Sequence, residues 1–189
     1  MKTDAGCRTC TTKIRILLYL GGLTGIAFSQ QIPKGWRQFV SVEGSYIAYF
    51  PKSWYLLPPS LPTLRVGNFP PSRMVRAVVL PTGGADISVL APRSGITTVE
   101  QWISSGGPPE AQVESRRSIT LERPALRMPL RVAEVVSESL EGQETVSWCF
   151  ELSDRLLVAN LSYWKGDSNA QKYRQILSAM IQTIAPLAR

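Results

Sequence analysis

The sequence contains no histidine and only three cysteines among its 189 residues. Without histidine, neither a Ser-His or Cys-His catalytic pair nor a histidine-ligated metal site can form. Cys7 and Cys10 precede an apolar segment that we interpret as a targeting signal, so Cys149 stands alone in the remainder. We therefore expect no disulfide in the processed chain and no bound metal or cofactor. An enzyme would have to rely on carboxylates, lysine, tyrosine or Cys149.

A run of apolar residues long enough to cross a membrane is also lacking. The run from Ile16 to Phe28 is broken by glycines and falls short of the ~20 residues that a spanning helix needs. It follows a basic start, formed by Lys2, Arg8, Lys13 and Arg15, and Ala27 and Ser29 place small residues at −3 and −1 of a cut before Gln30. We predict a signal peptide over residues 1–29 and a single exported domain over residues 30–189, with an uncleaved anchor as the alternative. No cysteine stands directly after the apolar run, where Ser29, Gln30 and Gln31 follow, so we do not expect lipid attachment.

Strong charge of either sign is absent from the predicted domain. The whole chain carries a formal charge of +7, but four of its 21 basic and one of its 14 acidic side chains fall in residues 1–29. This leaves 17 basic against 13 acidic side chains, a net charge of +4. So mild an excess suits an exported protein and does not predict binding to nucleic acid.

Several short segments rich in β-branched and aromatic residues predict strands, separated by Gly, Pro and Asp turns. The predicted strands cover residues 37–42, 45–50, 75–80, 86–90, 113–121, 131–140, 145–152 and 156–164. The last three should form a meander, and the prolines at positions 58, 59 and 62 predict an extended loop. In residues 113–121 the alternation predicts one face formed by Val113, Ser115, Arg117, Ile119 and Leu121.

Two helices are predicted. Thr97 should cap a short one that extends to about Ser104, with Glu100 as its capping-box partner. Asp167 or Ser168 should cap a long one, with Gln171 completing a box with Ser168. Its apolar stripe is formed by Tyr173, Ile176, Leu177, Met180, Ile181 and Ile184. The fold class is therefore α+β, an antiparallel sheet of about six to eight strands flanked by a long C-terminal helix and a short helix.

The order of these elements resembles that of the PsbP-like domain family. The resemblance rests on the segment Tyr49-Phe50-Pro51-Lys52-Ser53-Trp54, the strand meander, and the ending in which Tyr163-Trp164 leads into the helix that carries Tyr173. It implies an antiparallel sheet sandwiched by helices, in a family whose members bind and stabilise other proteins. The chain has no histidine to offer a metal, so the manganese-related role of the photosynthetic members is not carried over.

Three groups of residues invite a chemical interpretation, and each has a structural one. Ser162 and Lys165 match S-x-x-K, but at the end of a strand they should point to opposite faces. Glu134 and Glu138 share a strand face, where we expect solvated cross-strand ion pairs rather than acid–base chemistry. Cys149 should be a buried or half-buried, inert thiol.

The expected function is that of an exported, non-enzymatic accessory protein of the cell envelope. Candidate partner-binding residues are Arg123, Arg127 and Arg131, which form a basic loop, and Tyr55 and Trp164, which are expected to be exposed beside the proline loop. The partner would be another envelope or secreted protein, and contact with a membrane surface is possible. The alternative is a small-molecule or lipid-binding module with a pocket between sheet and helix.

Overall fold

The computed structural model describes residues 32–58, 64–74, 79–92, 95–104, 112–123 and 129–187. The predicted signal peptide lies outside these residues. No helix in the described segments is long and apolar enough to cross a membrane.

A small antiparallel sheet is formed by β1 (Trp36–Ser41), β2 (Tyr46–Pro51) and β10 (Ala185–Pro186), with β2 in the middle. β1 and β2 are the predicted hairpin. β10 joins from far along the chain, since Ala185 pairs with Ile47. The alternation of β2 buries Tyr46, Ala48 and Phe50 against the main core, so this sheet covers part of the larger one.

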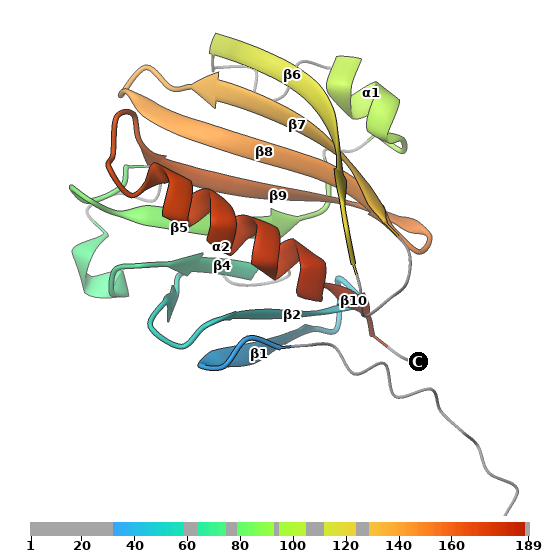
Figure 1. Cartoon of the computed structure of the whole chain (residues 1–189), viewed down its shortest axis with the longest axis horizontal. Helices are drawn as coiled ribbons and strands as arrows, with labels where there is room; N and C mark the ends of the chain where they lie inside the picture. Colours follow the sequence, from blue (N-terminus) through green and yellow to red (C-terminus); the bar gives the residue numbers. More distant parts are fainter. Residues whose placement is uncertain are drawn as a thin grey trace, which may run out of the picture.

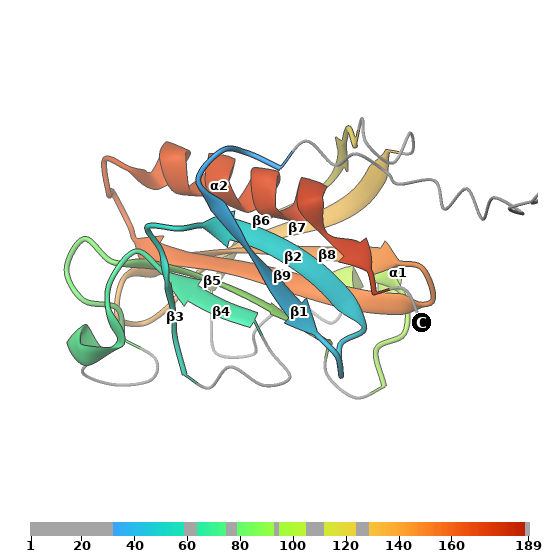
Figure 2. The ribbon, with the colours of Figure 1, turned by 90° about the horizontal axis from the view of Figure 1, so that it is seen from below.

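The large sheet has the strand order β3-β4-β5-β9-β8-β7-β6 and is antiparallel throughout (Figures 1 and 2). The predicted meander is present as β7, β8 and β9, and β5 pairs with its last strand. The strands are β3 (Tyr55–Leu56), β4 (Leu64–Gly67), β5 (Ala85–Leu90), β6 (Gln112–Leu121), β7 (Leu130–Glu138), β8 (Gln143–Leu152) and β9 (Arg155–Trp164).

The two helices cover opposite faces of the large sheet. α2 (Ala170–Thr183) contacts β9 and β2 and buries the predicted stripe in the main core, with Ile176 partly buried (Figure 1). α1 (Val99–Ser104) places Trp102 in a second core on the other face, together with Ala133, Val135, Cys149 and Val158. A single turn of 3₁₀ helix, η1 (Pro71–Arg73), follows β4. The predicted α+β class is confirmed, with two sheets where the sequence predicted one.

The caps of both helices differ from the prediction. In α1, Thr98 accepts a hydrogen bond from the Gln101 N–H at 3.1 Å, and Gln101 Oε1 accepts from the Thr98 N–H at 3.3 Å. The capping box therefore begins one residue later than predicted and uses Gln101 in place of Glu100. In α2 the cap residue is Asn169, without a side-chain capping bond, while Asp167 accepts the Asn169 N–H at 2.7 Å. The predicted Ser168–Gln171 box is wrong, because the helix begins one residue later than this box requires, after the cap residue Asn169.

Two strand predictions are also corrected. Val79 and Leu80 lie outside any strand, and residues 75–78 lie outside the described part. β5 instead pairs with β4, which lies within residues 58–71, the segment that the sequence predicts as a proline loop. In β6 the register shifts between Val113 and Ser115. Because one extra residue reverses the faces, Val113 packs in the second core while Ile119 and Leu121 pack in the main core.

Candidate functional site

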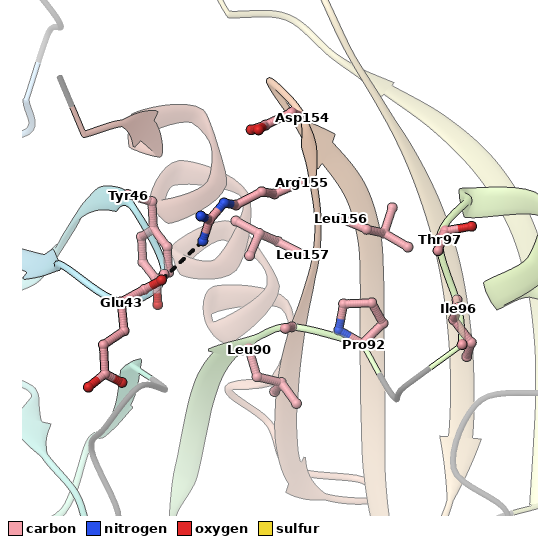
Figure 3. A pocket seen from close by; sticks show the side chains of 13 residues that line it. Glu43, Tyr46, Leu90, Pro92, Ile96, Thr97, Asp154, Arg155, Leu156 and Leu157 are labelled. Atoms are coloured by element: carbon pink, nitrogen blue, oxygen red, sulfur yellow. Dashed lines mark hydrogen bonds between the residues drawn. The ribbon is translucent and has the colours of Figure 1, made fainter. Parts of the chain in front are cut away.

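The candidate site is a cavity at the end of the sandwich where three connections meet. These are the β1–β2 turn, the β8–β9 turn and the segment that leads from β5 to α1. The cavity has a volume of about 510 Å³, and its apolar lining includes Leu90, Pro92, Ile96, Leu156 and Leu157 (Figure 3). This volume lies within the range of ~300–1,000 Å³ that is usual for ligand sites. The arrangement can therefore bind an apolar group.

Tyr46 forms one wall of this cavity and joins the two sheets. Its hydroxyl donates to the Val89 carbonyl at 3.2 Å and accepts from the Leu64 N–H at 3.4 Å, so β2 is tied to β5 and β4. Burial raises the pKa of Tyr46 to about 12. The phenol therefore stays protonated at neutral pH, and its hydrogen bonds hold the two sheets together.

Gly44 sits in the β1–β2 turn because a larger residue would not fit. A Cβ atom placed there would lie 2.5 Å from Ser41 Oγ and 2.6 Å from the Tyr46 ring. The Gly44 N–H donates to Ser41 Oγ at 3.0 Å, which holds the turn against the ring. The next residue, Ser45, has a φ of +53°. The local sequence thus produces a tight, strained rim at the mouth of the cavity.

Arg155, the first residue of β9, crosses from the β8–β9 turn to the β1–β2 turn. Its Nη1 atom donates to the Glu43 carbonyl at 3.0 Å (Figure 3). A second cavity of about 230 Å³ lies beside the first and shares Gly44, Asp154, Arg155 and Leu157 with it. Arg155 therefore lines both of two adjoining hollows, and the rim carries both signs of charge. Among the described residues, no group of three or more cysteine, aspartate or glutamate side chains is arranged to hold a metal ion.

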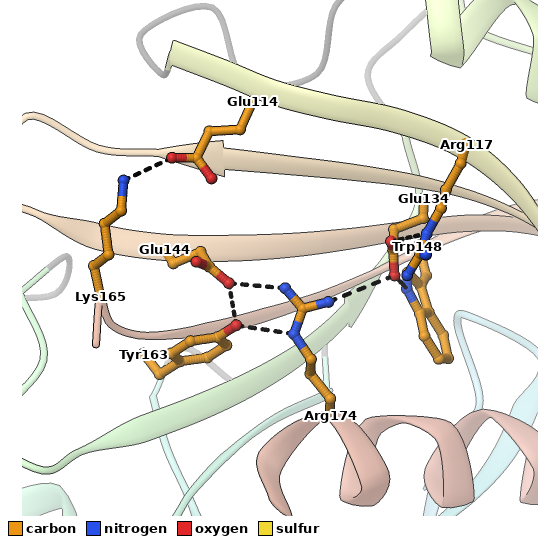
Figure 4. Close-up of polar contacts among 8 residues, drawn as sticks. All are labelled: Glu114, Arg117, Glu134, Glu144, Trp148, Tyr163, Lys165 and Arg174. Atoms are coloured by element: carbon orange, nitrogen blue, oxygen red, sulfur yellow. Dashed lines mark hydrogen bonds and ion pairs between the residues drawn. The ribbon is translucent and has the colours of Figure 1, made fainter. Parts of the chain in front are cut away.

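Of the predicted carboxylate pair, Glu134 belongs to a separate polar network beside α2 (Figure 4), whereas Glu138 pairs with Lys165. The Glu134 side chain is only 3% exposed, and its oxygens accept Arg117 Nε at 2.6 Å and Trp148 Nε1 at 2.8 Å. Arg174 on α2 lies 3.9 Å from the same carboxylate. Cross-strand ion pairing is confirmed here, but the solvated face predicted for Glu134 is wrong, because α2 covers it.

Arg174 extends this network along the sheet. Its Nη2 atom contacts Glu144 at 2.8 Å and its Nε atom donates to the Tyr163 hydroxyl at 3.0 Å, while Tyr163 also donates to Glu144. Burial, followed by the hydrogen bond to Glu144, raises the pKa of Tyr163 to about 12. These groups hold α2 on the sheet.

Ser162 and Lys165 do not meet as an acylating pair would require. Ser162 Oγ is 3.1 Å from Thr145 Oγ1. Lys165 Nζ lies 2.7 Å from Glu114 and 2.5 Å from Glu138, and its hydrogen bonds to these carboxylates raise its pKa. A lysine so paired is a poor proton acceptor.

The structure places the three predicted arginines differently. Arg123 is buried, and its guanidinium donates to the Ile184 carbonyl at the C-terminal end of α2, where a cation is favourable. Burial lowers the pKa of Arg123. Arg131 is exposed on β7, and Arg127 lies outside the described residues. Arg123 therefore does not share a surface with Arg131, contrary to the predicted basic loop.

The two predicted aromatic residues lie in different strands of the large sheet, Tyr55 in the edge strand β3 and Trp164 at the end of the central strand β9. Tyr55 in β3 is 45% exposed, as expected of a surface contact. Trp164 is half-buried against a small cluster of Leu57, Phe69 and Leu80, and its Nε1 atom donates to the Pro81 carbonyl at 3.1 Å. Trp164 is thus held by the core more than the sequence predicted.

Cys149 is buried in the second core, as predicted. Burial, together with the nearby carboxylates of Glu151 and Glu100, raises the pKa of its thiol to about 12. The reactive thiolate is therefore scarce at neutral pH.

Sequence reasoning missed the cavity itself. The predicted strands leave Glu43-Gly44 and Ser153-Asp154 as turns between them, but no local pattern shows that these two turns lie side by side. That proximity depends on the pairing of β2 with β10 and on the Tyr46 contacts between the sheets.

Comparisons with known proteins give structural matches only. No family model and no curated protein matches the sequence. The chain is similar to a crystal structure from Bacteroides thetaiotaomicron, with 11% identity and a TM-score of 0.47 over 80% of this chain and 48% of the other. It thus spans about half the length of that protein. It is also similar to the solution structure of cyanobacterial PsbP from a Synechocystis species, with 9% identity and a TM-score of 0.41 over 88% of this chain and 98% of the other. A cyanobacterial PsbP is thus among the solved structures to which this chain is similar.

Proposed function

We propose that this protein is an exported, non-enzymatic accessory protein of the cell envelope, which binds a segment of another envelope or secreted protein at the end cavity. The observation that carries the proposal is the pair of adjoining hollows that are both lined by Arg155. An extended segment can place one apolar group in each hollow while its polar backbone passes the arginine. Leu157 lines both hollows and supplies an apolar surface shared by them.

Export is supported by the basic start, the apolar run and the small residues before Gln30. The intact mass of the protein isolated from its native cells tests this point. A chain that begins at Gln30 supports a cleaved signal peptide. A chain that begins at Met1 and is found in the membrane fraction would show that the signal is retained as a membrane anchor.

A non-catalytic role is supported by the way in which reactive groups are engaged. Lys165 is held by two carboxylates, Glu134 by Arg117 and Trp148, and Cys149 is buried as a thiol. Each group therefore has a structural task that accounts for its placement.

Partner binding is tested with a photo-crosslinking residue placed at Ala91, which is exposed and lines the cavity. The matched control carries the same residue at Ser72, which is exposed in η1 beyond the opposite end of β5. The proposal expects one envelope protein to be captured from position 91 and not from position 72. Its capture should be lost when Pro92→Arg introduces a charge into the apolar lining, because Pro92 is only partly buried and lies outside the core. Equal capture from both positions would contradict the proposal.

A second candidate function is the binding of a small molecule or lipid in the same cavity, favoured by the volume of about 510 Å³. The cavity lies at the end of the sandwich and not between the sheet and α2, where the sequence-based alternative had placed it. Native mass spectrometry distinguishes the two functions. A retained small mass that Ala91→Trp displaces would favour the ligand, and a clean protein mass favours the partner segment.

A further inference from the structure

The outer edge of the large sheet is formed by β6, which pairs with β7 on one side and with no other strand among the described residues. From Ser115 to Leu121 the register with β7 is unbroken, running from Ser115 opposite Val136 to Leu121 opposite Leu130. In such a strand alternate N–H and C=O groups point away from the sheet. This edge therefore offers a regular row of backbone donors and acceptors to a further strand.

The bulge at Glu114 sets where the usable edge begins. The register shifts between Val113 and Ser115, and Glu114 is held back by Lys165 at 2.7 Å. A bulge kinks the strand and interrupts pairing. An added strand would therefore pair from Ser115 onward.

Two exposed arginines at this edge contact no carboxylate in the described part of the chain. Arg116 lies opposite Val135 in β7, and Arg131 in β7 lies opposite Thr120, so both side chains point to the same face of the sheet. On the other face Arg117 is 62% exposed although it contacts Glu134.

The acidic side chains nearby do not neutralise these two arginines. Glu114 and Glu134 are each held by another cation, and Glu122 lies beyond the paired run. Glu151 in β8 and Glu100 in α1 lie on the same face as Arg131, near Cys149, but neither forms an ion pair with Arg116 or Arg131 in the described part of the chain. Residues 115–121 contain no acidic side chain, so the paired run of β6 itself carries only positive charge.

We propose that β6 binds an acidic extended segment of another protein as an additional strand, along residues 115–121. Backbone pairing would supply the affinity, and Arg116 and Arg131 would select carboxylate side chains on the segment. Pairing of β6 with a second copy of itself is disfavoured, because it would bring the arginines of both copies together. This surface is separate from the end cavity, so the two proposals stand independently.

The test measures binding of synthetic peptides to the purified protein by fluorescence anisotropy. The peptides match residues 115–121 in length, have blocked ends, and alternate threonine with either glutamate or lysine. We expect the glutamate peptide to bind and the lysine peptide not to bind. The double variant Arg116→Ala, Arg131→Ala should bind about tenfold more weakly. The control Lys34→Ala, Lys52→Ala removes two exposed cations elsewhere and should change the affinity less than about twofold.

Strand addition makes a further prediction that charge alone does not. Two versions of the glutamate peptide are compared, one N-methylated at its odd-numbered amides and the other at its even-numbered amides. Only one version should bind, because only one of these two sets of N–H groups faces β6 in a paired strand. Alternate amides of residues 115–121 should gain protection from hydrogen exchange. Equal binding of both methylated peptides, or of acidic and basic peptides, would overturn the proposal. The proposal would also be overturned if the protein bound phosphatidylglycerol vesicles through these arginines but bound no peptide. A protein that is dimeric at the concentration of the assay would likewise overturn it.

Discussion

Glu134 on β7 lies directly opposite Trp148 on β8, and the indole N–H donates to its carboxylate at 2.8 Å. The same carboxylate accepts Arg117 from the edge strand and lies 3.9 Å from Arg174 on α2. One buried anion thus connects two strands, the sheet edge and the covering helix. An anion in such a place is tolerated only while its cations and donors remain.

The first prediction follows from this burial. Glu134→Gln removes the negative charge between Arg117 and Arg174 and should lower the free energy of unfolding by about 3 kcal/mol. Glu138→Gln is the control, because Glu138 and its partner Lys165 are 30% and 48% exposed, and should cost less than about 1 kcal/mol. Urea denaturation measures both. Equal costs would show that Glu134 behaves as a surface group.

Gly44→Ala should destabilise the protein by about 2 kcal/mol, because the new Cβ would press on the Tyr46 ring and Ser41 Oγ. Gly35→Ala is the comparison. It has open space around its Cβ but a φ of +83°, so it should cost about 1 kcal/mol through the backbone alone. Thermal or urea unfolding of the pair separates the two causes. A Gly44→Ala cost below that of Gly35→Ala would contradict the close contact.

Ser153→Gly should stabilise the protein by about 0.5 kcal/mol, since Ser153 has a φ of +58° and glycine adopts that region without strain. The gain is small because glycine also increases the entropy of the unfolded chain. Ser88→Gly, in the middle of β5, should instead cost about 1 kcal/mol. Loss of stability in both variants would argue against strain at the β8–β9 turn.

Stability should fall in alkaline solution. Burial raises the pKa values of Tyr46, Tyr163 and Cys149 in the folded state to about 12, above the ordinary values of 10.0 for tyrosine and 9.0 for cysteine. Each group therefore favours the folded state while protonated, and this contribution disappears as the pH rises through about 12. Unfolding free energies measured from pH 8 to 12 should decline above pH ~9, by up to about 1.4 kcal/mol per unit for each group. Tyr46→Phe should make the loss of unfolding free energy above pH ~10 less steep. An unfolding free energy that does not change with pH over this range would show that the pKa values of these groups are not raised by folding.

Local periodicity was sufficient for the elements that carry most of the core. The stripe of α2 and the alternation of β8 and β9 repeat over many residues, so a single register explains each of them. By contrast, β4 is a strand of four residues behind a proline-rich segment, too short for a pattern. The sequence of β6 alternates regularly across the bulge, although the residues before and after it face opposite sides of the sheet. Only the pairing with β7 shows this change of face.

The candidate sites depended even more on long-range pairing. Arg123 looked like one member of a basic loop, but the end of α2 approaches it and buries its guanidinium. The end cavity is assembled from turns whose residues are separated by about a hundred positions, such as Glu43 and Arg155. Composition and spacing identify such residues as turns and do not indicate which turns meet.

The pairing of β10 with β2 also constrains the order of folding. The β1–β2 hairpin is synthesised first among the described strands, but its third strand, Ala185–Pro186, and the helix it packs on, Ala170–Thr183, emerge last. Contacts of such large sequence separation form slowly. The small sheet therefore gains its third strand, and β2 its contact with α2, only when the last described residues of the chain have been synthesised.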